Sequence, residues 1–203
     1  MKTLMTAVFT ALATLLVPYF ALSQQAEQPK YVQGDWWKVK SEFEAKVSSR
    51  SPGCQDSYKE WVVKIDGQGL AHLYGMDGGK EVEAICDPVL GWVFGVNETK
   101  SLKFPLSVGQ TWTGRYERAS GRRTIWVEPE YKVTGFQKVE TPKGTFDAFK
   151  IVGAAKWVTG RGDHRFIDWT EYYSPPVKAI VLLQSETPST KRKVVLVDFN
   201  VSN

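Results

Sequence analysis

A cluster of acidic and aromatic residues in the last quarter of the chain is the first candidate for chemistry. Asp168 and Glu171 lie among Trp169, Tyr172 and Tyr173. Two carboxyl groups in one cleft can hydrolyse a glycosidic bond, and aromatic rings beside them suit a sugar. Alternation along a strand, however, points Asp168 and Glu171 to opposite faces. We therefore interpret these acids as a charged solvent face, with a carboxylate-based hydrolase as an alternative.

Metal and cofactor chemistry finds little support in the residue spacing. The chain has two histidines, His72 and His164, which are far apart in the sequence. A metal site needs several His, Cys, Asp or Glu ligands at suitable spacing. Neither a glycine-rich phosphate-binding loop nor a G-x-S-x-G nucleophile turn is present. The sequence therefore predicts no catalytic residue, metal ligand or cofactor, and it favours a protein that is not an enzyme.

The two cysteines, Cys54 and Cys86, are predicted to form a disulfide. A lone pair of cysteines is usually joined in an oxidising compartment. Closing a loop of about 33 residues would stabilise the fold by roughly 3–4 kcal/mol on the chain-entropy model. A free reactive thiol is the alternative, although no C-x-x-C motif supports it.

Tryptophan is the most informative residue type, with eight copies that all fall in or next to predicted strands. Trp and Tyr suit surfaces that are apolar at one end and wet at the other. A sheet face lined with them forms either the core or the wall of an apolar cavity, and a packed core is the default interpretation. The candidates for a ligand-binding face are Trp61, Trp112, Trp126, Trp157, Trp169 and Tyr172.

Basic residues gather at two places. They are Arg115, Arg118, Arg122 and Arg123 around one predicted hairpin, and the run Lys191-Arg192-Lys193. Such side chains can face an anionic envelope surface. They also keep exposed strand edges from pairing with other chains, and this edge role is the preferred interpretation.

The composition is that of a secreted globular domain. Of 203 residues, 42% are hydrophobic and 24% are charged, with a net charge of +4. These values argue against intrinsic disorder and give no support for nucleic-acid binding. Residues 1–23 have the layout of a signal peptide, with a basic start, an apolar stretch and small residues at Ala21 and Ser23. An uncleaved anchor is the alternative; otherwise residues 24–203 form a single domain.

Short alternating runs separated by Gly, Pro, Asn and Asp predict an all-β fold. In the first run after the leader, Trp37, Val39 and Phe43 share one face, while lysines and glutamates occupy the other. About ten strands joined by short turns favour a curved antiparallel sheet, as a half-barrel, barrel or sandwich. The predicted strands include Ser101–Leu106, Gln110–Arg118, Arg123–Glu128 and Tyr131–Thr141.

Three segments of the second half resemble a group of uncharacterised secreted bacterial proteins rich in β-structure. They read LKFPLSVGQTW from residue 102, then YKVTGFQKVETPKGTFDAFKI, then WTEYYSPPVKAIVLL. The section from Cys54 to Cys86 has no counterpart in this resemblance. The resemblance implies a curved antiparallel sheet, similar to the half-barrels of periplasmic lipoprotein and lipid carriers, and it supplies no catalytic residues.

Together these features predict a non-enzymatic periplasmic or secreted bacterial protein. It would bind an apolar or amphipathic ligand, such as a lipid, or an envelope protein, on an aromatic-rich concave face. A structural subunit of a cell-surface assembly is one alternative, and a hydrolase of envelope glycans or lipids is another. The sequence predicts no nucleic-acid partner and no membrane span once the leader is removed.

Overall fold

A computed structural model of the chain describes residues 24–45, 58–84, 93, 102–120, 123–159 and 162–202. The predicted signal peptide and both cysteines, Cys54 and Cys86, lie outside these residues. Cleavage of the leader and pairing of the cysteines therefore stay predictions. Within the described ranges, no helix has the length and apolar character needed to cross a membrane.

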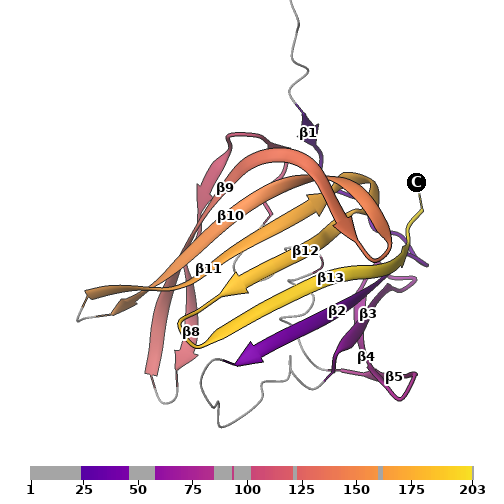
Figure 1. Cartoon of the computed structure of the whole chain (residues 1–203), viewed down its shortest axis with the longest axis horizontal. Coiled ribbons are helices and arrows are strands. Elements are labelled where there is room, and N and C mark those ends of the chain that lie inside the picture. Colours follow the sequence, from indigo (N-terminus) through magenta and orange to yellow (C-terminus); the bar gives the residue numbers. More distant parts are fainter. Residues whose placement is uncertain are drawn as a thin grey trace, which may run out of the picture.

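The fold is built almost entirely from β-strands (Figure 1). The strands are β1 (Gln25–Ala26), β2 (Trp36–Ala45), β3 (Glu60–Ile65), β4 (Ala71–Asp77), β5 (Lys80–Glu83), β6 (Leu106–Ser107), β7 (Thr111–Thr113), β8 (Tyr116–Ser120), β9 (Arg123–Thr141), β10 (Gly144–Thr159), β11 (Gly162–Ser174), β12 (Ala179–Glu186) and β13 (Thr190–Asn200). One 3-10 turn, η2 (Pro175–Val177), precedes β12. These elements confirm the predicted all-β class.

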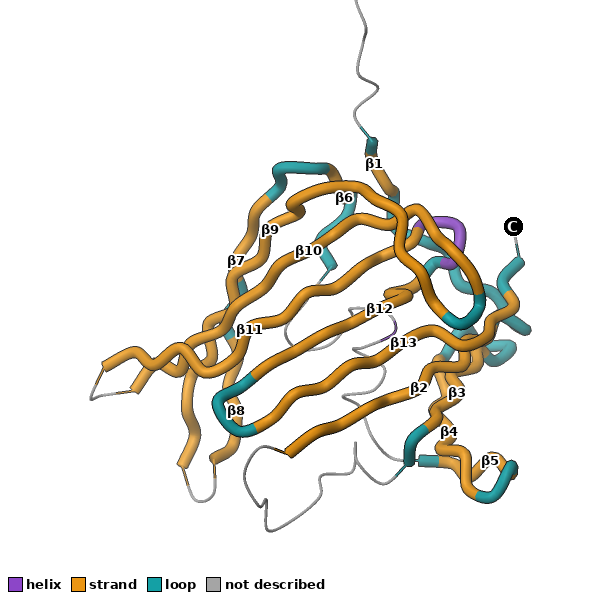
Figure 2. The backbone as a smooth tube through the Cα atoms, viewed as in Figure 1, coloured by secondary structure: helices purple, strands orange, loops and turns teal. Residues whose placement is uncertain are grey.

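Eleven of the strands form one sheet, in the order β5-β4-β3-β2-β13-β12-β11-β10-β9-β7, with β8 also paired to β9. All of these pairs are antiparallel. β1 and β6 form a separate two-stranded sheet. In the part of the chain that the structure describes, β5 and β7 each have one neighbour, so the curved sheet is open rather than a closed barrel (Figure 2).

Period-two alternation explains why the long strands form. In β2, Trp37 and Val39 are completely buried, whereas Lys38 and Lys40 beside them are partly exposed on the opposite face. Val39 pairs with Leu196 of β13, which is also completely buried. Directly paired residues share a face of a sheet, so neighbouring strands build one continuous apolar surface. We call the face that carries Trp37, Val39 and Leu196 the inner face, and the other the outer face.

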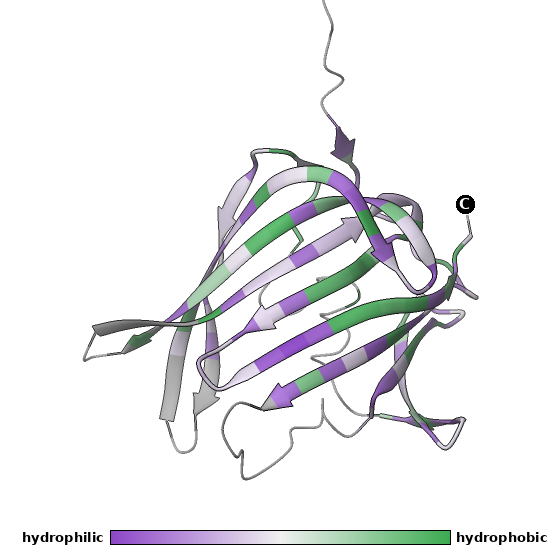
Figure 3. Cartoon of the chain, in the orientation of Figure 1, coloured by the Kyte–Doolittle hydropathy of each residue, from purple (hydrophilic) through white to green (hydrophobic). Residues whose placement is uncertain are grey.

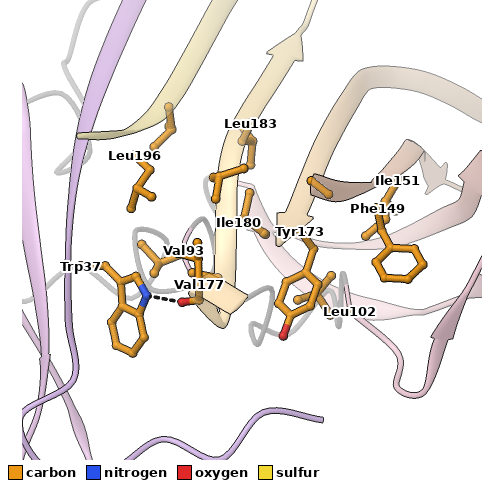
Figure 4. Close-up of a cluster of buried hydrophobic side chains, with 14 of the residues drawn as sticks. Trp37, Val93, Leu102, Phe149, Ile151, Tyr173, Val177, Ile180, Leu183 and Leu196 are labelled. Atoms are coloured by element: carbon orange, nitrogen blue, oxygen red, sulfur yellow. Dashed lines mark hydrogen bonds between the residues drawn. The ribbon is translucent and has the colours of Figure 1, made fainter. Parts of the chain in front are cut away.

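The hydrophobic core lies against the inner face (Figure 4). Trp37, Phe149, Ile151 and Tyr173 are almost completely buried. Trp37 Nε1 donates a hydrogen bond to the carbonyl oxygen of Val177 at 2.8 Å, so this indole is buried with its polar atom satisfied. Burying side chains of this size contributes about 1.5–3 kcal/mol each. Burial also raises the pKa of the Tyr173 phenol, which stays neutral.

The segment from residue 101 to 141 differs from its predicted arrangement. Where a strand over Ser101–Leu106 was predicted, the structure has only the short strand β6. The predicted strand Gln110–Arg118 is divided into β7 and β8. The predicted strands Arg123–Glu128 and Tyr131–Thr141 are joined into the single strand β9. Pro129 lies inside β9, where proline normally removes a ladder hydrogen bond. Its carbonyl accepts from Gly114 N at 3.0 Å, in the gap between β7 and β8. Because the N–H and C=O of a strand residue point the same way, the missing N–H also faces this gap, and no ladder bond is lost.

A buried carboxylate joins three distant parts of the chain. Asp35 is completely buried and accepts hydrogen bonds from Val32 N (3.2 Å) and Ser202 N (2.7 Å). Lys178 Nζ lies 3.3 Å from Asp35 Oδ2, and Tyr31 donates its hydroxyl to Lys178 O at 3.1 Å. Losing one partner of a buried ion pair leaves the other charge uncompensated. The cluster therefore holds the start of β2, the turn after η2 and the C-terminal segment together.

Candidate functional site

The predicted ligand-face residues occupy different environments. Trp61 is completely buried, in edge-to-face contact with Tyr58 (ring centroids 5.1 Å apart). Trp112 is also buried, and its ring stacks on Tyr131 at 5.1 Å. Trp169 is partly buried and meets the same Tyr131 ring edge-to-face at 5.4 Å. The structure thus brings Trp112 and Trp169 together around Tyr131, which was not among the predicted ligand-face residues.

Trp126 and Tyr172 lie away from this cluster. Trp126 precedes the buried Val127 in β9, so it takes the outer face, where it is 38% exposed. Tyr172 lies three residues from Trp169 in β11 and also takes the outer face. The side chain of Trp157 is outside the described part of the chain. The five candidates whose side chains are described therefore do not share one face.

A glycine fixes the position of the Trp169 ring. Gly153 in β10 pairs with Trp169 in β11. A Cβ atom on Gly153 would lie 2.5 Å from Trp169 Nε1 and closer still to Cε2, which no side chain permits. The indole therefore lies directly over the glycine backbone. Its Nε1 is buried without a hydrogen-bond partner, so packing alone holds this ring in place.

The same residues belong to one row that crosses seven strands on the inner face. From β7 to β2 the row is Trp112, Tyr131, Gly153, Trp169, Ser185, Arg192 and Phe43. At its β2 end, the Arg192 guanidinium lies 5.0 Å from the centre of the Phe43 ring, which is 39% exposed. The row marks the margin of the core. Its side chains are buried at the Trp112 end and exposed at the Phe43 end.

A hollow of about 730 Å³ lies across five strands at this level of the sheet. Its lining residues are Glu42, Phe43 and Glu44 of β2, Lys191, Arg192 and Lys193 of β13, Gln184, Ser185 and Glu186 of β12, Asp168, Trp169 and Thr170 of β11, and Val152 and Gly153 of β10. Strand register arranges them as the inner-face row between two outer-face rows. No described inner-face residue beyond that row lines the hollow. It therefore opens on the outer face, with the middle row supplying main-chain atoms, and we call it the outer-face trough.

Two rows of mostly polar side chains form the walls of the outer-face trough. One wall is Val152, Thr170, Gln184, Lys193 and Glu42, and the other is Asp168, Glu186, Lys191 and Glu44. Both walls mix donors with acceptors: Lys193 pairs with Glu42, and Lys191 Nζ lies 3.9 Å from Glu186 Oε1. Figure 3 shows β13 hydrophilic along this stretch and hydrophobic further on. Of all the residues that line the trough, the sequence marked as candidates only the basic run of β13, Asp168 and Trp169.

Asp168 and Glu171, interpreted from the sequence as a charged solvent face with a hydrolytic pair as the alternative, lie on opposite faces, as their spacing indicated. The solvent-face interpretation is wrong for Glu171, which is 4% exposed on the inner face, between Ile151 and Leu183, because strand register turns it toward the core. Asp168 is exposed and lines the trough, where it pairs with Glu186 across β11 and β12. Within the described ranges, no three His, Cys, Asp or Glu side chains come together as a metal-binding group.

Two aspartates outside the trough have lowered pKa values because of local contacts. A hydrogen bond with His72, whose Nε2 lies 2.8 Å from Asp66 Oδ2, lowers the pKa of Asp66 between β3 and β4. Contact with Lys143 lowers the pKa of Asp198 in β13. The first pair stabilises a turn, and the second ties the tip of the β9–β10 hairpin to β13.

Comparisons with known proteins give distant structural likenesses. No family model matches the chain, and no curated protein matches it. Three crystal structures are similar. A protein from Bacteroides fragilis, described as exported and with a YmcC-like fold, is 10% identical and covers 86% of this chain and 99% of its own, with a TM-score of 0.39. A protein from Parabacteroides distasonis, described as a lipoprotein, is 12% identical over 87% and 100%, with a TM-score of 0.42.

The third similar structure is that of the hypothetical lipoprotein YmcC from Escherichia coli. It is 6% identical and covers 89% of this chain and 92% of its own, with a TM-score of 0.36. All three TM-scores are below 0.5, so these likenesses assign neither a function nor a site to this chain. The candidate site therefore depends on the geometry of the outer-face trough alone.

Proposed function

We propose that the protein is a non-enzymatic secreted binding protein that holds an extended, amphipathic chain of sugar residues in the outer-face trough. The observation that carries this proposal is the hollow of about 730 Å³ across β2, β13, β12, β11 and β10. Strands lie 4.7–4.9 Å apart, so five strands give a trough roughly 19 Å long. Its two walls are two residues apart along each strand, which makes it roughly 7 Å wide. These proportions suit an extended chain rather than a compact molecule.

The mixture of charges in the walls favours a ligand rich in hydroxyl groups. Carboxylates only accept hydrogen bonds and lysine ammonium groups only donate them, whereas a hydroxyl group does both. A polyhydroxylated chain can thus satisfy Glu42 beside Lys193 and Glu186 beside Lys191. A ligand of one charge would meet like charges in each wall. The neutral amides and hydroxyls of Gln184 and Thr170 continue the same pattern toward β10.

The distribution of apolar groups favours a sugar chain over an acyl chain. The largest rings of the inner face, including Trp37, Trp61 and Phe149, are buried in the core. In the trough, the exposed apolar contribution comes from Val152 and from the aliphatic parts of the lysines. Such narrow apolar strips can contact the C–H faces of sugar rings, while a lipid tail would stay largely in water.

The proposal is tested by isothermal titration calorimetry of the full mature chain against a panel of neutral and acidic oligosaccharides. We expect at least one neutral oligosaccharide to bind. Lys193→Ala and Gln184→Ala should each weaken that binding, by about tenfold for the charged donor. The matched control is Lys138→Ala, because Lys138 is 74% exposed on the β9–β10 hairpin, outside the trough.

Three results would contradict the proposal. If no oligosaccharide of the panel binds, or if Lys138→Ala weakens binding as much as Lys193→Ala, the trough is not the site. If a bound oligosaccharide is cleaved and Asp168→Asn abolishes the cleavage, the protein is a hydrolase rather than a binding protein.

A further inference from the structure

A row of apolar side chains runs beside one wall of the outer-face trough. Tyr172 of β11 pairs with Leu182 of β12, and Leu182 pairs with Val195 of β13. Each of the three lies two residues along its strand from a residue of that wall, so all of them project from the outer face. Tyr172 and Leu182 are partly buried, and Val195 is 5% exposed. We call these three residues the apolar ledge.

The β9–β10 hairpin bounds the apolar ledge on the side away from the trough. Lys143, at the tip of this hairpin, forms an ion pair with Asp198 of β13, and the centres of the Phe146 and Phe199 rings lie 5.8 Å apart. Figure 1 shows the hairpin curling toward the C-terminal end of β13. Because Asp198 is only three residues beyond Val195, the ledge is a single row of side chains wide. A small substituent fits there, whereas a long acyl group would meet the hairpin.

The trough wall beside the ledge supplies neutral polar groups at the same place. Thr170 pairs with Gln184, and this pair lies directly beside the pair of Tyr172 and Leu182. The Gln184 amide both donates and accepts hydrogen bonds, and so does the Thr170 hydroxyl. The two pairs form a patch of four side chains that is half neutral polar and half apolar. A group that matches this patch has a donor, an acceptor and a small apolar end, and it carries no charge.

We propose that the sugar chain held in the trough carries acetamido groups, as N-acetylhexosamines do; this inference rests on the proposed function. The amide of an acetamido group can hydrogen-bond with Gln184 and Thr170 while its methyl group covers Leu182 and Tyr172. A hydroxyl group in its place would leave this apolar surface in contact with water. A free amine or a carboxylate would lose its hydration beside Leu182 and Val195 without gaining a partner there.

The test is isothermal titration calorimetry of the full mature chain with chitotetraose, cellotetraose and fully deacetylated chitotetraose. These sugars share one backbone and differ only in whether each ring carries an acetamido, hydroxyl or amine group at the same carbon. We expect chitotetraose to bind about tenfold more tightly than cellotetraose, from one buried methyl group and one further hydrogen bond. The deacetylated form should bind more weakly than chitotetraose. In Tyr172→Ala and in Leu182→Ala, the preference for chitotetraose should fall to about threefold or less, while the affinity for cellotetraose stays the same.

Tyr74→Ala is the matched control, because Tyr74 is a partly buried tyrosine on the outer face of β4, outside the trough. Thermal unfolding checks the fold of each variant, and the comparison of the three sugars on the unaltered chain needs no variant. The proposal is overturned if cellotetraose binds as tightly as chitotetraose, or if Tyr74→Ala lowers the preference as much as Tyr172→Ala does. If other oligosaccharides bind in the trough and chitotetraose does not, this proposal fails while the proposed function stands. If no oligosaccharide binds, both fail.

Discussion

Replacing Gly153 with alanine should disrupt the aromatic cluster on the inner face. The added Cβ would occupy the space of the Trp169 indole, 2.5 Å from Nε1. The ring cannot simply slide along the sheet, because it also meets Tyr131 edge-to-face at 5.4 Å. The indole must therefore leave its place over β10.

The expected cost combines two effects. Forcing extra atoms into a packed region typically costs about 1–3 kcal/mol. Losing the contact between Trp169 and Tyr131 adds about 0.5–1.5 kcal/mol. We therefore expect Gly153→Ala to lower the free energy of unfolding by about 2–4 kcal/mol, a large share of the stability of an ordinary domain.

Urea unfolding followed by circular dichroism measures this loss, and Gly135→Ala provides the matched control. Gly135 lies in the neighbouring strand β9, and a Cβ there would meet no heavy atom within 4 Å. Alanine at such a position reduces the freedom of the unfolded chain and stabilises by about 0.4–1 kcal/mol. The two substitutions are chemically identical, so the difference between them isolates the clash with the indole.

A double-mutant cycle identifies Trp169 as the cause. In a Trp169→Ala background, the added methyl at Gly153 meets no ring, so Gly153→Ala should cost less than about 1 kcal/mol. If Gly153→Ala is as harmless as Gly135→Ala, or costs the same with and without the indole, the placement of Trp169 over Gly153 is refuted.

The buried carboxylate, an exposed ion pair and the cysteines give three more tests. Asp35→Ala should lower the free energy of unfolding by about 3–5 kcal/mol, because it leaves a buried lysine uncompensated; a loss below about 1 kcal/mol would argue against this. The contact with Lys143 lowers the pKa of Asp198. This ion pair therefore stabilises the folded protein at pH values above the usual aspartate pKa, and the stabilisation is lost as the pH falls through the lowered pKa of Asp198. A carboxyl NMR titration with an ordinary aspartate pKa would contradict that contact. Thiol labelling of unreduced, unfolded protein should find neither Cys54 nor Cys86 reactive, and two reactive thiols would exclude the disulfide.

The strands could be predicted from the sequence because alternation is a local property. The apolar side of β2, with Trp37 and Val39, was evident from period-two spacing. The division of β7 and β8 was not, because it depends on Pro129 facing a gap that exists only once three strands are paired. A proline by itself predicts a strand end.

The candidate site could be predicted only in part because it depends on strand register. Trp169 was singled out as an aromatic residue, but its partners Tyr131 and Gly153 come from strands whose alignment no local pattern specifies. The trough walls raise the same difficulty, since Glu42 and Lys193 are distant in sequence and adjacent in space. Predicting faces requires alternation alone, whereas predicting neighbours across strands requires the whole sheet.

Amide chemical-shift mapping of the isotope-labelled chain, with an oligosaccharide that binds, tests the proposed sugar site most directly. We predict that the shifted amides gather on adjacent residues of β2, β13, β12 and β11, at the level of Lys193, Gln184 and Thr170. Shifts confined to the β9–β10 hairpin, or spread over the sheet without a centre at the trough, would contradict it.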